Sequence, residues 1–211
     1  PVSFNAAHTI QFAIQEFRRP EFEMKVSSSK GTSMLFGETT RLTSKAKYFA
    51  GGSLKGSPVS WQVRASESTY SPPGWQGFRF GTSTNYWGGC CPMPMPGGNY
   101  ITKNLQATAD GNGETAVEVK LDLLPKPAPV SCVCEATIQD VNRQSWSDKV
   151  NILVHPADTY VGVKSRRWFY RVTDPIELEF IAVDLDGKAK DGQKIAVEQI
   201  GRAQSELQSL R

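Results

Sequence analysis

The sequence predicts an all-β chain built from tandem antiparallel β-sandwiches. Three observations support this fold class. Short segments alternate apolar and polar residues with the period of two that strands burying one face require. Turn-forming Gly, Pro, Asn and Asp residues separate these segments, and related sequence patterns recur at one fixed spacing. Helical periodicity is absent until residues 203–210, which are compatible with a frayed helix at the end of the chain.

The N-terminal part of the chain contains a step between two predicted strands. Residues 9–15 alternate like a half-buried strand, and a new alternation begins at Phe22. Between them, Pro20 lacks a backbone donor and holds Arg19 in an extended conformation. We interpret this step as a junction between two stacked β-domains.

The remaining strands follow from the same alternation. They are predicted at residues 41–49, 59–63, 117–123, 132–138, 150–154, 160–164, 176–183 and 194–200, with turns at 51–56 and 110–113 and a proline-rich stop at 125–129. Short strands with turns at this spacing are typical of a sandwich.

Three sequence features recur 136 residues apart, which predicts two copies of one sandwich type. They are the strand-to-proline steps at Pro20 and Pro156, the strand residues Leu42 and Leu178, and the turn glycines Gly56 and Gly192. The copies define three expected parts of the chain. Residues 1–17 would be the last strand or strands of a preceding domain, 18–155 a complete sandwich, and 156–211 the truncated start of a further one. The residues expected to act as inter-domain hinges are Arg18, Arg19, Pro20, His155 and Pro156.

Residues 66–99 form a long insertion rich in Gly, Pro and aromatic residues. Loops of this length are usually functional or packed down on their own domain. Trp75, Tyr86 and Trp87 could therefore stack against sugar rings or a protein partner, or they could hold the loop against its own sandwich. The sequence leaves both readings open.

Composition excludes several classes of protein. The 211 residues carry 24 basic and 21 acidic side chains, for a net charge of +3, so neither nucleic acid nor an anionic membrane is expected as the main partner. No apolar run approaches the ~20 residues of a membrane span. With 39% hydrophobic residues, the chain can form packed cores. It begins mid-strand without a leader, so we expect it to be a piece of a longer protein.

The four cysteines fall in two close pairs, Cys90 with Cys91 and Cys132 with Cys134. Cys132 and Cys134 point to the same face of a strand, and the Gly/Pro loop around the first pair could deliver a partner. One or two disulfides would indicate an extracytoplasmic compartment. Free buried thiols are the second possibility. A four-thiolate zinc site is the third, although neither pair has the usual Cys-x2–4-Cys spacing.

Motifs that carry catalysis are missing. The two histidines, His8 and His155, both lie at predicted strand ends, where capping or polar packing explains them. Residues 184–187 and 110–113 superficially resemble calcium loops, but they lack the ligand at the twelfth position and fit hairpin turns better. We therefore expect no catalytic, cofactor-binding or metal-ligating residues, and no enzyme activity.

Several segments together resemble the macroglobulin-like domains of bacterial alpha-2-macroglobulins. They are residues 15–23 (QEFRRPEFE), 48–61 (YFAGGSLKGSPVSW), 69–75 (TYSPPGW), 140–144 (DVNRQ) and 155–158 (HPAD). The resemblance extends from about residue 9 to 200 in the family's order. It implies macroglobulin-like β-sandwiches, with an architecture like that of immunoglobulin and fibronectin type III domains, inside a secreted or periplasmic endopeptidase inhibitor.

In such inhibitors a protease cuts an exposed bait segment and the molecule collapses around it. In many members an internal thioester also couples to the protease. This chain shows neither part, because Cys134, Glu135 and Ala136 lack the glutamine that the thioester motif requires. The resemblance thus implies a structural scaffold segment. Its partners would be neighbouring domains of the parent chain and, through the intact parent, target proteases. The alternative is an extracellular binding module that recognises glycan or a protein through residues 66–99.

Overall fold

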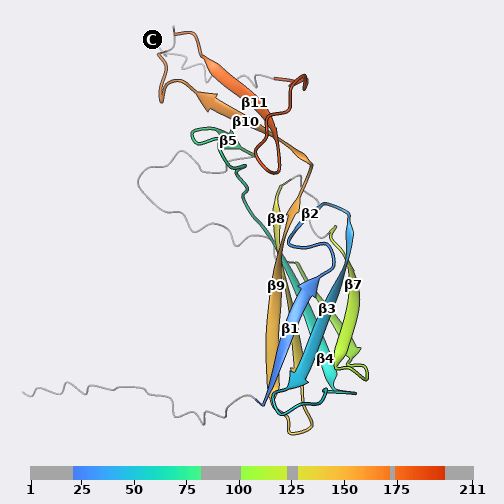
Figure 1. The fold of residues 1–211 in the computed structure, drawn as a ribbon. Helices are drawn as coiled ribbons and strands as arrows, with labels where there is room; N and C mark the ends of the chain where they lie inside the picture. Colours follow the sequence, from blue (N-terminus) through green and yellow to red (C-terminus); the bar gives the residue numbers. More distant parts are fainter. Residues whose placement is uncertain (1–20, 82–100, 123–127, 172–173, 198–211) are drawn as a thin grey trace, which may run out of the picture.

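A computed structural model of the chain describes residues 21–81, 101–122, 128–171 and 174–197. Every regular element in these ranges is a strand, which confirms the all-β prediction. The strands are β1 (Phe22–Ser28), β2 (Ser33–Leu35), β3 (Thr39–Tyr48), β4 (Pro58–Glu67), β5 (Arg79–Phe80), β6 (Ile101–Thr108), β7 (Glu114–Lys120), β8 (Val130–Gln139), β9 (Ser145–His155), β10 (Thr159–Ser165) and β11 (Leu178–Asp184). They form an elongated body with a long sandwich and a smaller sheet at one end (Figure 1).

The sandwich consists of two layers. One sheet has the strand order β1-β3-β7, and the other has the order β2-β9-β8-β4-β6. All pairings are antiparallel except that of the short β2 with β9, which is parallel. The inner faces follow the predicted alternation, because Phe22 and Leu42 of one sheet and Val59, Trp61 and Val63 of the other are all buried.

Three buried polar side chains bond to one another in the core. The Trp61 indole Nε1 donates to the Thr115 hydroxyl at 3.3 Å, and the hydroxyls of Thr115 and Ser44 lie 2.8 Å apart. This chain of bonds joins β4 of one layer to β7 and β3 of the other. A large aromatic residue can therefore fill the core without leaving its N–H unpaired.

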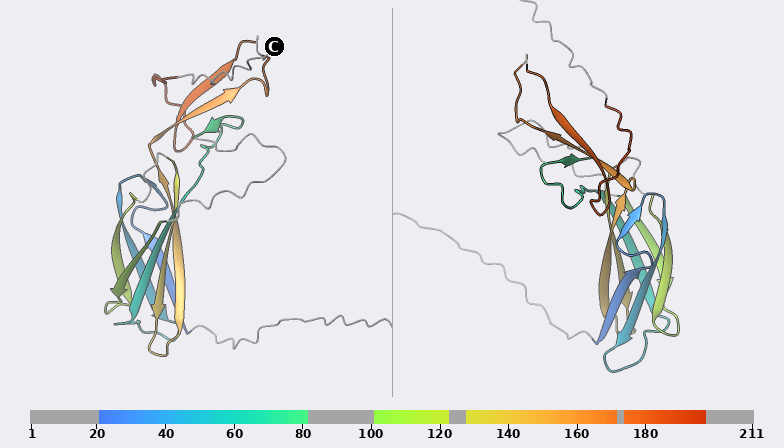
Figure 2. Two further views of the ribbon diagram at one scale, coloured as in Figure 1. Left: turned by 180° about the vertical axis from the view of Figure 1, so that it is seen from behind. Right: turned by 45° about the horizontal axis from the view of Figure 1, so that its top comes forward.

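A second, three-stranded sheet, here called the C-terminal sheet, lies at one end of the sandwich (Figures 1 and 2). Its order is β11-β10-β5, and all its pairings are antiparallel. Strands β10 and β11 come from the end of the chain, but β5 comes from residues 79–80, between β4 and β6 of the sandwich. The chain therefore crosses between the two units three times, once in each interval β4–β5, β5–β6 and β9–β10.

The turn after β3 and the turn after β11 share one hydrogen-bond pattern at a spacing of 136 residues. Tyr48 N donates to Gly52 O, and Asp184 N donates to Lys188 O. The isolated bridges Lys47–Ser53 and Val183–Ala189 are offset by the same number, as are the positive-φ glycines Gly51 and Gly187. The repeat seen in the sequence is thus a repeat of backbone geometry.

One predicted strand differs from the structure. Residues 194–197 are described and are not part of a strand, although a strand was expected at 194–200. The predicted strand at 9–15 and the frayed helix at 203–210 lie outside the described residues.

Candidate functional site

At the junction between the sandwich and the C-terminal sheet, residues that lie far apart in the sequence contact one another. Residues 68–81, here called the strut, leave the end of β4 and reach the C-terminal sheet (Figure 1). The strut begins with a 2.8 Å hydrogen bond from Ser68 N to Pro129 O, at the start of β8. It ends in β5, which pairs with Gly162 and Val163 of β10.

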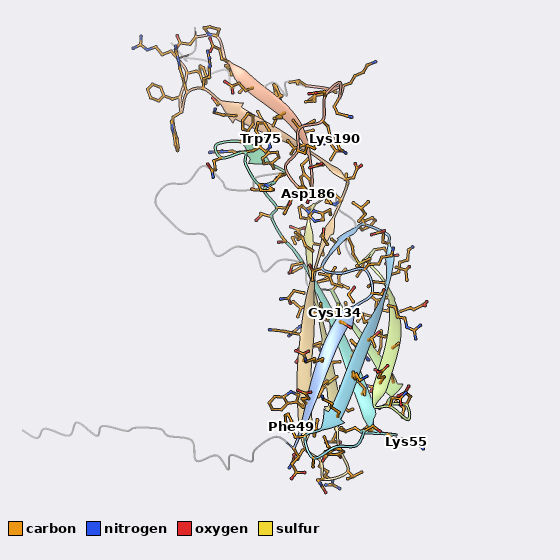
Figure 3. All side chains as sticks on the ribbon, viewed as in Figure 1. Phe49, Lys55, Trp75, Cys134, Asp186 and Lys190 are labelled. Atoms are coloured by element: carbon orange, nitrogen blue, oxygen red, sulfur yellow. The ribbon has the colours of Figure 1, made fainter. Side chains whose placement is uncertain are left out.

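Two strut side chains bind carbonyl groups in the turn that follows β11. The Tyr70 hydroxyl donates to Leu185 O, and the Trp75 indole Nε1 donates to Gly187 O at 2.7 Å. Figure 3 shows Trp75 close to Asp186 in that turn. Both carbonyl groups belong to an irregular turn with no strand partner, so aromatic donors supply bonds that the sheet does not provide.

The conformation of the turn after β11 allows the strut to approach it closely. The Asp184 carboxylate accepts hydrogen bonds from Asp186 N at 3.0 Å and Lys188 N at 2.8 Å, which fixes the loop. Gly187 has a φ of 82°, and a Cβ there would lie 2.1 Å from the carbonyl oxygen of Pro73. Glycine is required at this position both for its backbone conformation and for the close approach of the strut.

Aromatic side chains secure the far end of the strut. The Phe80 ring covers Gly162 of β10, where an added Cβ would lie 2.6 Å from a ring atom. Trp75 and Phe78 pack edge to face with ring centroids 5.7 Å apart. The ammonium group of Lys164, also on β10, lies 5.5 Å from the centre of the Phe78 ring.

A second cluster, here called the junction cluster, consists of Ser33, Tyr70, His155 and Tyr160. His155 ends β9 and is only 2% exposed. Its Nδ1 lies 2.9 Å from the Tyr160 hydroxyl of β10, and its Nε2 lies 3.1 Å from the Ser33 hydroxyl of β2. The Tyr70 ring packs against His155 with centroids 4.7 Å apart and against Tyr160 at 5.2 Å. The imidazole of His155 thus contacts β2, the strut and β10, and it links the sandwich to the C-terminal sheet.

Burial sets the titration behaviour of the junction cluster. Desolvation lowers the pKa of His155, because the cluster offers it neutral hydroxyl groups and no carboxylate. Burial, reinforced by Tyr70, raises the pKa of Tyr160 to about 12. Burial also raises the pKa of Tyr70, with smaller contributions from Asp186 and Asp184. At neutral pH the cluster is therefore an uncharged, hydrogen-bonded contact.

The predicted hinge residues divide into two groups. His155 and Pro156 lie at the β9–β10 crossing, and His155 is a member of the junction cluster. Arg18, Arg19 and Pro20 lie outside the described residues. The hinge role of all five stays a prediction.

Of the three predicted binding residues of the insertion, the structure describes one. Trp75 contacts the turn that follows β11 of the C-terminal sheet, because its N–H donates to Gly187 O. Its ring packs on Phe78 within the strut. Neither sequence interpretation of the insertion named that sheet as its contact. Tyr86 and Trp87 lie outside the described residues. Sequence reasoning missed the strut, because single aromatic donors to distant carbonyl groups leave no periodic pattern.

The second cysteine pair lies in the sandwich core. Cys132 and Cys134 on β8 are free, buried thiols that face the other layer. Burial raises the pKa of Cys132 to about 11, and burial together with Cys132 raises that of Cys134 to about 12. Cys90 and Cys91 lie outside the described residues, so their disulfides stay a prediction. A bond to either buried sulfur would require opening the core.

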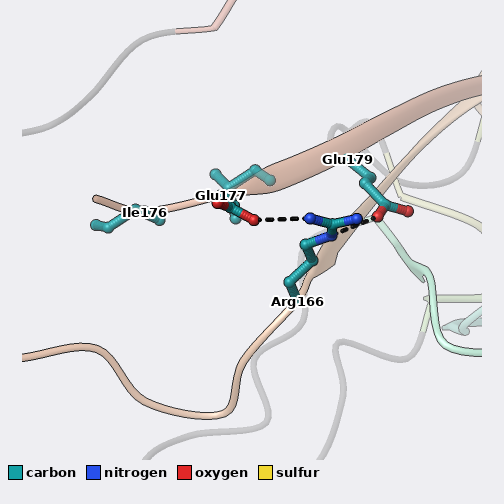
Figure 4. A pocket seen from close by; sticks show the side chains of 5 residues that line it. Arg166, Ile176, Glu177 and Glu179 are labelled. Atoms are coloured by element: carbon teal, nitrogen blue, oxygen red, sulfur yellow. Dashed lines mark hydrogen bonds and ion pairs between the residues drawn. The ribbon is translucent and has the colours of Figure 1, made fainter. Parts of the chain in front are cut away.

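Two further features of the described residues were considered as sites, a surface hollow and groups of possible metal ligands. A shallow hollow near the open end of β10 and β11 is lined by Arg166, Ile176, Glu177, Leu178 and Glu179 (Figure 4). Arg166 pairs there with Glu177 at 3.0 Å and Glu179 at 3.5 Å, but all three side chains are solvated. No group of His, Cys, Asp and Glu among the described residues is arranged to hold a metal ion.

The layers and the strand order define a macroglobulin-like β-sandwich fold. The chain shares this fold with bacterial alpha-2-macroglobulins of known structure. The native form of the Escherichia coli protein matches 85% of this chain with a TM-score of 0.59 at 14% identity. The trypsin-activated form matches 81% with a TM-score of 0.57, also at 14% identity. Salmonella alpha-2-macroglobulin reacted with methylamine matches 83%, with a TM-score of 0.59 at 16% identity. In each case the chain spans 12% of the matched protein.

Sequence comparison gives a separate result. No family model matches the chain. The curated Circularly permutated Ras protein 2 of Dictyostelium discoideum is 26% identical over 155 residues, which is 72% of this chain and 4% of that protein. In the described ranges no helix is long and apolar enough to cross a membrane.

Proposed function

We propose that this chain is a structural scaffold segment of a larger, alpha-2-macroglobulin-like protease-trapping inhibitor that acts outside the cytoplasm. In this role it performs no catalysis. It fixes the position of one β-unit relative to the next, and its partners are the neighbouring domains of the parent chain. Target proteases are contacts of the intact parent.

The observation that carries the proposal is the docking of the strut on the turn after β11. A single linker such as residues 156–158 would leave two domains free to rotate about it. Here the strut adds a second attachment through the bonds from Tyr70 to Leu185 and from Trp75 to Gly187. Two attachments at different points on the C-terminal sheet oppose both rotation and bending.

The comparisons support the proposal through the fold alone, which the chain shares with the native and the trypsin-activated forms of the E. coli protein. A rigid segment of this kind would carry motion from one part of the parent to another without deforming.

The rigidity can be tested by spin labelling. Lys55, near the far end of the sandwich, and Lys194, after β11, are both exposed and can be replaced by labelled cysteines. Cys90 and Cys91 would be replaced by serine, and the buried Cys132 and Cys134 left in place. We expect a single narrow distance distribution, which broadens when Tyr70→Phe and Trp75→Phe are combined. A broad distribution before these changes would contradict the proposal.

A second experiment addresses inhibition directly. Incubated with trypsin or elastase, the chain alone should neither trap nor inhibit the enzyme, because the scaffold role gives it no bait or coupling chemistry. Measurable inhibition would contradict a purely structural role.

A further inference from the structure

His155 is attached to the sandwich through its backbone and to the other unit through its side chain. It ends β9, pairs with Leu35 of β2, and accepts a 2.8 Å hydrogen bond from Phe36 N at its carbonyl oxygen. Its ring packs against Tyr70 of the strut and Tyr160 of β10, with centroids 4.7 and 5.8 Å apart. Two of the side chains that cover this buried imidazole therefore belong to the strut and the C-terminal sheet.

The hydrogen bonds of the junction cluster suit a neutral imidazole. A neutral ring has one donor and one acceptor, whereas a protonated ring has two donors and a positive charge. The hydroxyls of Tyr160 and Ser33 can each donate or accept, so they satisfy a neutral His155 in either tautomer. They can also accept from a protonated ring, but a neutral hydroxyl does not balance the added charge. A proton on His155 would thus be a poorly compensated buried charge.

The carboxylates on two of the segments that flank the junction cluster are bound to other groups. Glu38, which follows β2, accepts hydrogen bonds from Leu35 N at 2.9 Å and from Lys30 Nζ at 3.1 Å. Asp158, at the β9–β10 crossing, pairs with Lys190 at 3.2 Å. Neither carboxylate is a partner of the imidazole in these contacts.

The carboxylates of the turn after β11 act on the Tyr70 side of the cluster. Asp184 accepts from two backbone N–H groups of its own turn, and both Asp184 and Asp186 contribute to the raised pKa of Tyr70. Burial is what lowers the pKa of His155, so no neighbouring carboxylate offsets the desolvation of its charged form.

Hydration would compensate a charged imidazole, and it requires the rings that cover His155 to move. Tyr70 and Tyr160 can withdraw together with the strut and the C-terminal sheet, whereas β9 is held in place by its pairing with β2 and β8. Separation of the two units is therefore the movement that brings water to the ring. A state that exposes the imidazole binds a proton more readily, so acid favours that state.

We propose that His155 is an acid-sensitive contact, and that its protonation releases the strut and the C-terminal sheet from the sandwich while the sandwich stays folded. The chain is then stiff at neutral pH and flexible at acid pH. This is a regulation of the junction and rests on the proposed function, since a rigid junction must exist before a proton can release it.

Spin labels at Lys55 and Lys194, in the Cys90→Ser, Cys91→Ser chain, test the release. Trp75→Phe is added because it removes one docking bond and leaves the junction cluster unchanged, which brings release into the measurable range. We expect a single narrow distance distribution at about pH 7.5 and a growing broad component down to about pH 4.5. The ratio of released to docked molecules should rise by up to about tenfold for each unit of pH below about 6.5.

His155→Gln is the matched variant, because glutamine also offers a donor and an acceptor but does not titrate in this range. Its distance distribution should be the same at both ends of the pH series. A distribution that stays narrow with His155 present, or that broadens equally in His155→Gln, would overturn the proposal. A broad distribution already at about pH 7.5 would contradict the rigid junction itself, and this proposal with it, so the two failures are distinguishable.

Two further measurements separate release from unfolding and cover the case in which His155→Gln does not fold. The β-sheet signal in circular dichroism should persist at about pH 4.5, and its loss would show unfolding in place of release. The chain has two histidines, so the imidazole resonance that remains in His8→Gln belongs to His155. We expect this resonance to titrate below about pH 6.5, together with the spin-label transition. A midpoint at or above that pH would overturn the proposal.

Discussion

The indole nitrogen of Trp75 donates a 2.7 Å hydrogen bond to the carbonyl oxygen of Gly187, 112 residues farther along the chain. This bond joins the strut, which leaves the end of β4, to a turn of the C-terminal sheet. With the bond from Tyr70 to Leu185 O, it makes the junction a two-point attachment.

Removing these donors should loosen the junction without unfolding the sandwich. Trp75→Phe and Tyr70→Phe keep an aromatic ring but leave a turn carbonyl without its donor, at a cost of about 1 kcal/mol each. Hydrogen exchange should speed up in residues 68–81 and 184–190, while β4 and β8 stay protected. Faster exchange throughout the sandwich core would contradict this localised role.

Gly187 and Gly51 form a matched pair for testing the close approach of the strut. Both have positive φ, so alanine at either position should cost about 1 kcal/mol in backbone strain. At Gly187 the methyl group would also meet Pro73 O, and the strut must move away. We expect Gly187→Ala to release the strut in hydrogen exchange and Gly51→Ala to leave it docked. Equal effects would show that the crowding at Gly187 is relieved without moving the strut.

Leu42 and Leu178 occupy equivalent positions in the repeat but differ in burial. Leu42 is 0% exposed between the layers of the sandwich, whereas Leu178 on β11 is 44% exposed. Leu42→Ala should destabilise the chain by about 3 kcal/mol, and Leu178→Ala by less than about 1 kcal/mol. Urea unfolding followed by circular dichroism measures both. A large loss from Leu178→Ala would indicate that another layer covers β11 in solution.

His155 should make the junction sensitive to acid. Its pKa is lowered in the folded state by burial, so below the unfolded pKa of about 6.5 the unfolded chain binds the proton more readily. The stabilisation is fully present above that pH and is lost as the pH falls through the lower folded pKa. Unfolding experiments from about pH 7.5 down to about pH 4.5 should show this loss, and His155→Gln should reduce it. An unchanged pH dependence in His155→Gln would contradict this role.

The thiols of Cys132 and Cys134 should be inert in the folded protein. Their pKa values of about 11 and 12 leave almost no thiolate at about pH 8, and the core shields both sulfurs. In a Cys90→Ser, Cys91→Ser background, a thiol reagent such as dithionitrobenzoate should react only at the rate of unfolding. Rapid reaction under native conditions would show that β8 opens locally.

The sequence predicted the sandwich well because its strands bury one face. The alternation around Val59, Trp61 and Val63 and the two residues Cys132 and Cys134 on one face appear in the structure as expected. The strand expected at residues 194–200 is not formed over 194–197, because an alternating pattern alone does not supply a neighbouring strand.

The junction could be predicted only in part. The strand-to-proline step located His155 and Pro156, since proline leaves a local mark on the sequence. The partners of His155 come from β2, the strut and β10, and no local pattern connects them. The sequence places the strut in an insertion but does not indicate its partner, because the contacts are made with a turn more than a hundred residues away.

The position of β5 bears on how the protein can be divided for study. A gene fragment cut at Pro156 would separate β10 and β11 from the strand that completes their sheet, and would leave the strut with no turn to bind. The C-terminal sheet is therefore not encoded by one continuous segment of the sequence. An expression boundary that respects the fold must keep residues 68–81 together with the C-terminal strands, and so must include the sandwich that lies between them.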